Sequence, residues 1–155
     1  MALTEGATLP DLTLTASDGS PLALSTFIGA PLVLYFYPKD DTPGCTREAQ
    51  DFSAEAEAFA ALGAKVVGVS KDPPAKHQKF AAKYDLKVML ATDAEGEVME
   101  AFGAWVEKSM YGKKYMGIER STYLFDAAGK LVRVWPKVKV AGHAAEVLEA
   151  ARALG

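Results

Sequence analysis

The stretch LVLYFYPKDDTPGCTREA, from Leu32 to Ala49, decides the fold, because it joins a buried strand to the start of a long helix. Its first six residues form an unbroken apolar run, which is typical of a strand covered on both faces. From Cys45 to Leu62, apolar residues recur at steps of four and three, which predicts a helix that Gly63 closes. The run from Lys65 to Ser70 indicates the next strand. Together these segments predict a βαβ unit with two parallel strands.

Segments on either side of this unit complete an α/β architecture. A hairpin over residues 12–24 turns at Asp18-Gly19, a dipeptide that favours tight turns. The other expected elements are a helix from Pro74 to Tyr84, a strand over 88–90, a short helix over 97–102, a hairpin over 122–135 and a last helix from about Gly142 to Leu154. This is the thioredoxin-like order: a central mixed sheet flanked by helices, preceded by an N-terminal β-hairpin. We expect residues 1–155 to form a single domain.

Composition excludes several classes of protein. Of the 155 residues, 50% are hydrophobic, which is too many for a disordered chain. The net charge of -3 provides no basic field for nucleic acid or for an anionic membrane. The first residues lack the basic segment and apolar core of a secretory signal, and no apolar run is long enough to span a bilayer. We therefore expect a cytoplasmic protein that binds neither nucleic acid nor membrane.

Cys45 is the only cysteine, and it falls in the first turn of the long helix. Thr42 can cap this helix, and Pro43 suits its first position because the missing N–H would have no partner there. Cys45 is then the third helical residue, where free backbone N–H groups and the helix dipole favour a thiolate. The alternative is a small buried apolar residue that happens to begin a helix.

Three segments resemble the peroxiredoxins, the thiol peroxidases. Pro38 to Ala49 resembles the family's cysteine motif, which is Pro, three residues, Thr or Ser, two residues, Cys. Gly117 to Asp126 resembles the segment that supplies the family's active-site arginine, and Gly68 to Asp72 resembles its second central strand. The similarity runs nearly from end to end, and it is closest to the Q-type subgroup, the bacterioferritin comigratory proteins. The resemblance implies the thioredoxin-like fold as well.

Carried over by position, the resemblance assigns roles to four residues, and the missing side chain of Gly44 adds a fifth on physical grounds. Cys45 would be the peroxidatic cysteine, and Thr42 and Arg120 would orient and polarise the peroxide. Pro38 would shield the sulfur, and the backbone of Gly44 would let the peroxide approach. The chemistry needs no metal and no organic cofactor. Taken alone, Thr42 could be only a helix cap, and Arg120 could be only a solvated charge that opens a strand.

The chain departs from the subgroup where many members carry a second cysteine, because that position is Gln50 here. No disulfide can form within one chain. The resemblance then implies one-cysteine reduction of hydrogen peroxide and alkyl hydroperoxides, completed by an external thiol. Thioredoxin, glutaredoxin and low-molecular-weight thiols are all candidates for this reductant. Relatives of this type imply a monomer or a weak homodimer.

Other chemistry-bearing residues receive plainer interpretations. His77 and His143 lack further ligands at metal-binding spacing, so we read both as surface or helix-capping residues and predict no metal site. Glu48 falls outside the apolar stripe of its helix, on a side that we expect to meet water. The segment from Trp105 to Met116 is expected to be a loop that packs over the core, or an apolar wall for an alkyl peroxide.

Three classes of function follow from the same cysteine. The first is the thiol peroxidase, an antioxidant enzyme. The second is a redox sensor or relay, in which oxidised Cys45 passes its oxidation to a client protein. The third is a thioredoxin-fold binding module with an inert cysteine, which predicts that Cys45 reacts no faster than a free thiol.

Overall fold

The computed structural model describes residues 3–154, in which strands and helices alternate along most of the chain. The strands are β1 (Thr13–Ala16), β2 (Pro21–Ala23), β3 (Leu32–Phe36), β4 (Lys65–Ser70), β5 (Met89–Thr92), β6 (Trp105–Met110), β7 (Lys113–Ile118), β8 (Ser121–Phe125) and β9 (Leu131–Trp135). The helices are the 3-10 helix η1 (Leu24–Phe27) and the α-helices α1 (Pro43–Ala54), α2 (Ala56–Ala61), α3 (Pro74–Tyr84), α4 (Glu97–Phe102) and α5 (His143–Arg152).

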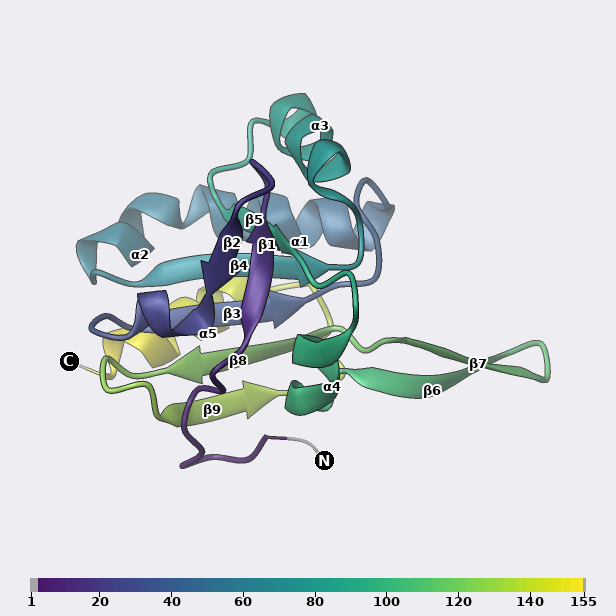
Figure 1. The fold of residues 1–155 in the computed structure, drawn as a ribbon. Coiled ribbons are helices and arrows are strands. Elements are labelled where there is room, and N and C mark those ends of the chain that lie inside the picture. The colour runs from purple at the N-terminus through teal and green to yellow at the C-terminus, as the bar shows by residue number, and fades with distance from the viewer. Residues whose placement is uncertain (1–2, 155) are drawn as a thin grey trace.

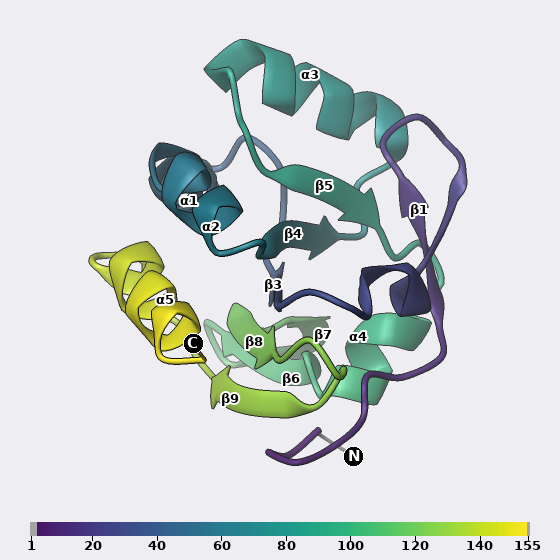
Figure 2. The ribbon, with the colours of Figure 1, turned by 90° about the vertical axis from the view of Figure 1, so that its left-hand side faces the viewer.

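Seven strands form one mixed sheet in the order β2-β1-β5-β4-β3-β8-β9. Strand β3 pairs in parallel with β4, which pairs in parallel with β5. On its other edge β3 pairs antiparallel with β8, and β1 pairs antiparallel with β5. Helices α1, α2 and α5 cover one face of the sheet, α4 and η1 lie on the other, and α3 lies over β5 (Figures 1 and 2).

The composition of β3 explains its central place. All five of its residues are buried, and their side chains alternate between two hydrophobic clusters. Leu32, Leu34 and Phe36 enter the cluster beside α4, whereas Val33 and Tyr35 enter the cluster beneath α1 and α5. A strand covered on both faces needs this continuous apolar run. Cys45 lies in the second of these clusters.

The expected thioredoxin-like α/β fold is confirmed, including the βαβ unit and the N-terminal hairpin of β1 and β2. The hairpin turns at Gly19, which has a φ of +88° that a glycine adopts without strain. The predicted helix from Cys45 to Leu62 was wrong in one respect, because it is divided at Glu55 into α1 and α2. Both halves keep their apolar stripe, and Phe52 contacts Phe59 across the break.

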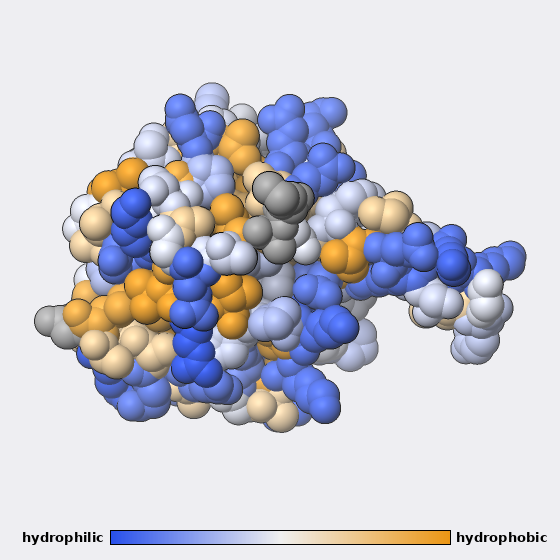
Figure 3. All heavy atoms as spheres, turned by 90° about the horizontal axis from the view of Figure 1, so that it is seen from below, coloured by the Kyte–Doolittle hydropathy of each residue, from blue (hydrophilic) through white to orange (hydrophobic). Residues whose placement is uncertain are grey.

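The segment from Trp105 to Met116 differs from the loop that the sequence led us to expect. It forms most of β6 and β7, an antiparallel hairpin that projects from the body (Figures 1 and 3). Tyr111 at its turn is 98% exposed, and Met110 and Met116 are also exposed. The expected packing over the core is wrong, because each strand of the hairpin pairs with the other and leaves both faces largely in solvent.

Within residues 3–154, no helix has both the length and the apolar character that crossing a membrane requires.

Candidate active site

The strand-to-helix turn between β3 and α1 brings Cys45 to the carboxyl end of the parallel strands. Pro43 is the first residue of α1 and Cys45 is the third, as the sequence predicts. The Thr42 carbonyl accepts the first helical hydrogen bond, from the Thr46 N–H at 2.8 Å. The Cys45 side chain is free and only 2% exposed. Its sulfur is therefore held at the start of the helix, beneath the surface.

Arg120 lies 75 residues after Cys45 in the sequence, but the fold brings its side chain to the sulfur. It precedes β8, the strand that pairs with β3, and this pairing brings its side chain over the start of α1. The Arg120 Nη2 donates to the Cys45 Sγ at 3.3 Å, and its Nη1 donates to the Glu48 Oε1 at 2.7 Å. Burial lowers the pKa of Arg120, but the charges of Glu48 and Cys45 outweigh this effect and raise it. The guanidinium therefore stays charged beside the sulfur.

Glu48 is a site residue that the sequence interpretation assigned wrongly to the water-facing side of the helix. Its side chain is 1% exposed because Arg120 provides a partner for it inside the protein. Burial raises the pKa of Glu48 to about 7, and the charge of Arg120 limits this rise. Its second oxygen, Oε2, is buried with no hydrogen-bond partner among the described residues. The three-residue spacing from Cys45, which places both side chains on one face of the helix, was the signal that could have found it.

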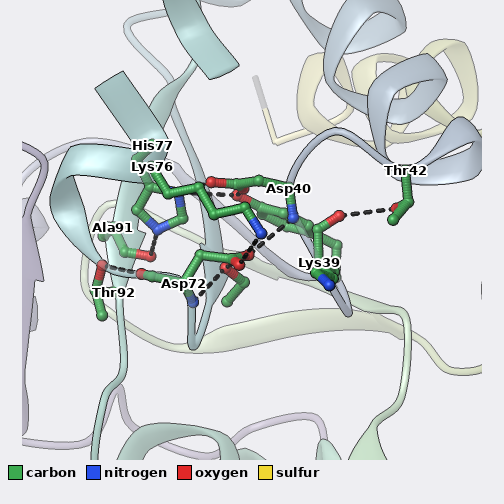
Figure 4. Close-up of polar contacts among 10 residues, drawn as sticks. Lys39, Asp40, Thr42, Asp72, Lys76, His77, Ala91 and Thr92 are labelled. Carbon is green, nitrogen blue, oxygen red and sulfur yellow. Dashed lines mark hydrogen bonds and ion pairs between the residues drawn. The ribbon is translucent and has the colours of Figure 1, made fainter. Parts of the chain in front are cut away.

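Thr42 is at the N-cap position, but its hydroxyl does not cap the helix. The hydroxyl donates instead to the Lys39 carbonyl at 2.8 Å, within the same turn (Figure 4). Its single hydrogen is thereby occupied, and the oxygen lone pairs remain available to accept a hydrogen bond. The expectation of a side-chain cap is wrong, because the Thr42 hydroxyl contacts the Lys39 carbonyl and accepts from no N–H of the first helical turn.

Gly44 packs directly under the arginine. A Cβ at this position would lie 3.1 Å from the Arg120 Nη2, closer than ordinary van der Waals contact. The absence of a side chain thus lets the guanidinium approach the first turn of α1. Pro38 comes after Tyr37, just beyond the end of β3, at an exposed position. Thr42, Gly44, Cys45 and Arg120 therefore gather at one turn, and Pro38 opens the loop that leads to it.

Both histidines are buried, so the prediction that they are surface or capping residues is wrong. His77, on α3, contacts Asp40 through Nδ1 at 2.6 Å and the Ala91 carbonyl through Nε2 at 3.1 Å (Figure 4). His143, the first residue of α5, contacts the Thr122 hydroxyl at 2.8 Å. A polar partner inside the fold accounts for the burial of each ring.

Residues 3–154 contain no group of three or more His, Cys, Asp or Glu side chains arranged to hold a metal ion.

Comparison with known proteins assigns the chain to a family. The family model described as AhpC/TSA matches residues 6–134. The chain belongs to this family. It is similar to Peroxiredoxin Bcp of Bacillus subtilis, at 49% identity over 96% of this chain and 95% of that protein. It is also similar to Peroxiredoxin Bcp of Xanthomonas campestris, at 48% identity over 92% of this chain and 89% of that protein.

Solved structures agree with this assignment. A structure of the Xanthomonas campestris bacterioferritin comigratory protein superposes with a TM-score of 0.90, at 45% identity over 97% of this chain and 98% of that one. A structure of Xylella fastidiosa PrxQ superposes with a TM-score of 0.93, at 38% identity over 99% and 98% of the two chains. Within its family the chain is thus a peroxiredoxin of the Bcp type, which makes it a thiol peroxidase, and the resemblance inferred from its motifs is confirmed.

Proposed function

We propose that the chain reduces hydrogen peroxide and alkyl hydroperoxides with Cys45 as its only redox-active sulfur. The observation that carries this proposal is the 3.3 Å contact from the Arg120 Nη2 to the Cys45 Sγ in the first turn of α1. A guanidinium and a helix N-terminus both stabilise negative charge at that sulfur. The substrate class is supported by the Xanthomonas campestris relative, which has been studied for its alkyl peroxide reduction activity.

The reaction requires charge to move from sulfur to oxygen. The Cys45 thiolate forms a bond to the terminal peroxide oxygen, the O–O bond breaks, and an alkoxide or hydroxide leaves with the bonding electrons. The oxygen and its hydrogen stay on Cys45 as a sulfenic acid, and the leaving group takes up a proton to become an alcohol or water. Arg120 stabilises the negative charge before and during this transfer, together with main-chain N–H groups of Gly44 and Cys45.

Thr42 would orient the peroxide, and Pro38 would shield the sulfur. Because the Thr42 hydroxyl donates its hydrogen to the Lys39 carbonyl, its oxygen can accept a hydrogen bond from the peroxide O–H. This contact would direct the O–O bond toward the sulfur while Arg120 acts on the oxygens. Pro38 has no N–H of its own and would limit the access of water to the turn from the other side.

The sulfenic acid must be reduced from outside the chain, because Cys45 is the only cysteine. An external thiol would attack the sulfenic sulfur and release water, and a second thiol would resolve the mixed disulfide and restore Cys45. Thioredoxin, glutaredoxin and a low-molecular-weight thiol all fit this step. The 2% exposure of Cys45 means that the turn has to open before a thiol of any size can reach the sulfur. We propose that the chain carries out this peroxidase cycle in the cytoplasm, as a single domain that is a monomer or a weak homodimer.

Peroxide consumption with each reductant tests the proposal. The native chain and Cys45→Ser are compared with thioredoxin, glutaredoxin and glutathione in turn, with hydrogen peroxide and with an alkyl hydroperoxide. Mass spectrometry records whether Cys45 gains one oxygen. We expect turnover with at least one reductant, and none above background for Cys45→Ser. Full activity in Cys45→Ser would refute the proposal, whereas slow turnover with a trapped client disulfide would favour the redox relay.

A further inference from the structure

A second buried polar cluster lies beside the reactive turn and takes no direct part in the proposed chemistry. It consists of Tyr37, which directly follows β3, Asp40 in the turn and His77 on α3. Figure 4 shows Asp40 and His77 side by side. The Asp40 Oδ1 accepts from the Tyr37 hydroxyl at 2.5 Å, and its Oδ2 lies 2.6 Å from the His77 Nδ1. The side chains of Asp40 and His77 are both 0% exposed. We call these three residues the support cluster.

The hydrogen-bond partners fix how many protons the support cluster holds. The His77 Nε2 faces the Ala91 carbonyl, which can only accept, so this nitrogen carries a hydrogen. Burial raises the pKa of Tyr37 well above its ordinary value, so its hydroxyl keeps its proton and donates to Asp40. One further proton remains between the Asp40 Oδ2 and the His77 Nδ1. The pair is electrically neutral with that proton on either atom, so it can be buried at low cost.

The support cluster is connected to the backbone of the turn that carries Thr42 and Cys45. The Asp40 N–H donates to the Asp72 Oδ2 at 2.8 Å, and the same oxygen accepts from the Ser70 hydroxyl at 2.8 Å. Both the side chain and the main chain of Asp40 are therefore held. The Lys39 carbonyl, which belongs to the peptide unit of the Asp40 N–H, accepts the Thr42 hydroxyl. A shift of Asp40 would thus move the acceptor that orients Thr42.

Asp41, the next residue of the turn, is also held by helix α3. Asp41 has a φ of +60°, a left-handed conformation that residues other than glycine rarely adopt. Its carboxylate accepts from the Lys83 Nζ at 2.8 Å and from the Tyr84 hydroxyl at 2.6 Å, both from α3. The turn is therefore held in a strained conformation by two groups of contacts with α3, of which only the His77 group is buried.

We propose that His77 is a positioning residue for the peroxide reaction, acting through Asp40 to hold the turn in which Thr42 and Cys45 face the substrate. This inference rests on the proposed function and extends it to a helix that does not touch the peroxide. The orientation of reacting groups accounts for large factors in rate, and displacements of about 1 Å have been found to cost on the order of a hundredfold. Loss of one of the two groups of contacts should cost less than that.

Two measurements on His77→Phe test the proposal, with His143→Phe as the matched control. His143 is a buried histidine like His77. Its hydrogen-bond partner is the hydroxyl of Thr122, which belongs to β8 and not to the turn. The first measurement is the second-order rate constant of reduced Cys45 with hydrogen peroxide, in a single turnover. The second is hydrogen exchange of the amides of residues 39–46. We expect His77→Phe to lower the rate constant about tenfold and to speed exchange in the turn, whereas His143→Phe should change neither.

Two further variants keep the test decisive if His77→Phe does not fold. Tyr37→Phe removes a single oxygen and should lower the rate constant about threefold. Asp40→Asn can restore the network with a neutral histidine, because its amide nitrogen can donate to the His77 Nδ1 while its oxygen accepts from Tyr37. The rate constant of Asp40→Asn should therefore stay within about threefold of the native value. It should also exceed that of His77→Phe. If His77→Phe does not fold, Asp40→Ala takes its place in this comparison.

The outcomes separate this proposal from the proposed function. If the native chain does not react with peroxide, the proposed function fails, and exchange in the turn still decides whether His77 holds it. If the native chain reacts and the folded variants of the support cluster match it in both rate and exchange, the positioning role is wrong. Equal losses in His77→Phe and His143→Phe would also overturn it, because they would indicate a general loss of stability.

Discussion

Two buried carboxyl groups flank the same turn and are treated differently by the fold. Asp40, in the support cluster, has both oxygens paired, with Tyr37 and with His77. Glu48, together with Cys45 and Arg120, belongs to what we call the reactive cluster. It has one oxygen paired with Arg120 and one with no partner among the described residues. In the support cluster both oxygens of the carboxyl group have hydrogen-bond partners, whereas in the reactive cluster one carboxyl oxygen has none among the described residues.

The difference shows that a buried polar group can either hold a segment rigid or take part in a reaction. A satisfied network rigidifies the segment that it holds, because any displacement leaves a buried group unpaired. Burial of the Glu48 carboxyl group raises its pKa to about 7, and its contacts with Arg120 only limit this rise. Arg120, with 18% of its side chain exposed, is the member of the reactive cluster that solvent can reach. The predictions below test this contrast, beginning with the largest effect.

His77→Phe should cause the largest loss of stability, because it leaves the Asp40 Oδ2 buried without its hydrogen-bond partner. Breaking a buried pair in this way costs about 3–5 kcal/mol of unfolding free energy. Arg120→Met should cost less, about 1–3 kcal/mol, because Glu48 can take up a proton near neutral pH. Urea unfolding at pH 7 measures both losses, with His143→Phe as a control that loses one neutral hydrogen bond. Equal losses of unfolding free energy in His77→Phe and Arg120→Met would show that the two clusters do not differ in how they stabilise the fold.

Arg120→Met should have the larger effect on rate. Removing one charge-stabilising donor from an active site typically costs about a hundredfold to a thousandfold. We expect a loss of this size in the rate constant of reduced Cys45 with hydrogen peroxide, measured by stopped flow. Arg133→Met is the control, because Arg133 is an exposed arginine on β9 that pairs with Glu146. A loss smaller than threefold in Arg120→Met would contradict the role of the guanidinium.

Glu48→Gln should change the pH dependence of the reaction more than its rate at low pH. As the pH rises through about 7, native Glu48 loses its proton and places a negative charge near a transition state that is itself negative. The ratio of native to variant rate constants should therefore fall about threefold to tenfold between pH 6 and pH 8. A ratio that is constant across this range would show that Glu48 does not titrate there.

His143 contributes one neutral hydrogen bond at pH 7, and its burial should make stability depend on pH in acid. Burial lowers its pKa to about 4 from an ordinary value of 6.5. Between these values the unfolded chain binds a proton that the native protein does not, so native stability falls as the pH drops from about 6.5 to about 4. Urea unfolding across this range should show a shallower fall for His143→Gln than for the native chain. The same slope in both would mean that the buried ring is protonated as easily as an exposed one.

Much of the fold could be predicted from the sequence, because periodicity reports which faces are buried. The run from Leu32 to Tyr37 and the stripe that begins at Cys45 predicted the βαβ unit. The projecting hairpin of β6 and β7 was missed, because the segment from Trp105 to Met116 is rich in apolar residues that usually indicate packing. Its strands are held by pairing with each other, and hydropathy does not report such pairing.

The site was predicted less completely. Cys45, Thr42 and Arg120 were found from motif spacing, and the structure brings Arg120 to the sulfur through the pairing of β3 with β8. Glu48 was assigned to the water-facing side because it falls outside the apolar stripe of its helix. His77 was interpreted as a surface or helix-capping residue because it lacks further ligands at metal-binding spacing. Their partners, Arg120 and Asp40, lie 72 and 37 residues away, and no local pattern reveals contacts at that distance.

The reactivity of reduced Cys45 toward hydrogen peroxide is the most direct test of the central claim, that this turn activates the only thiol of the chain. Stopped-flow measurement at pH 7 compares the second-order rate constant of the native protein with that of free cysteine. We expect the protein to react at least about a hundredfold faster, as one well-placed donor already supplies a factor of this size, and to end as a sulfenic acid on Cys45. A rate constant equal to that of free cysteine would contradict the account.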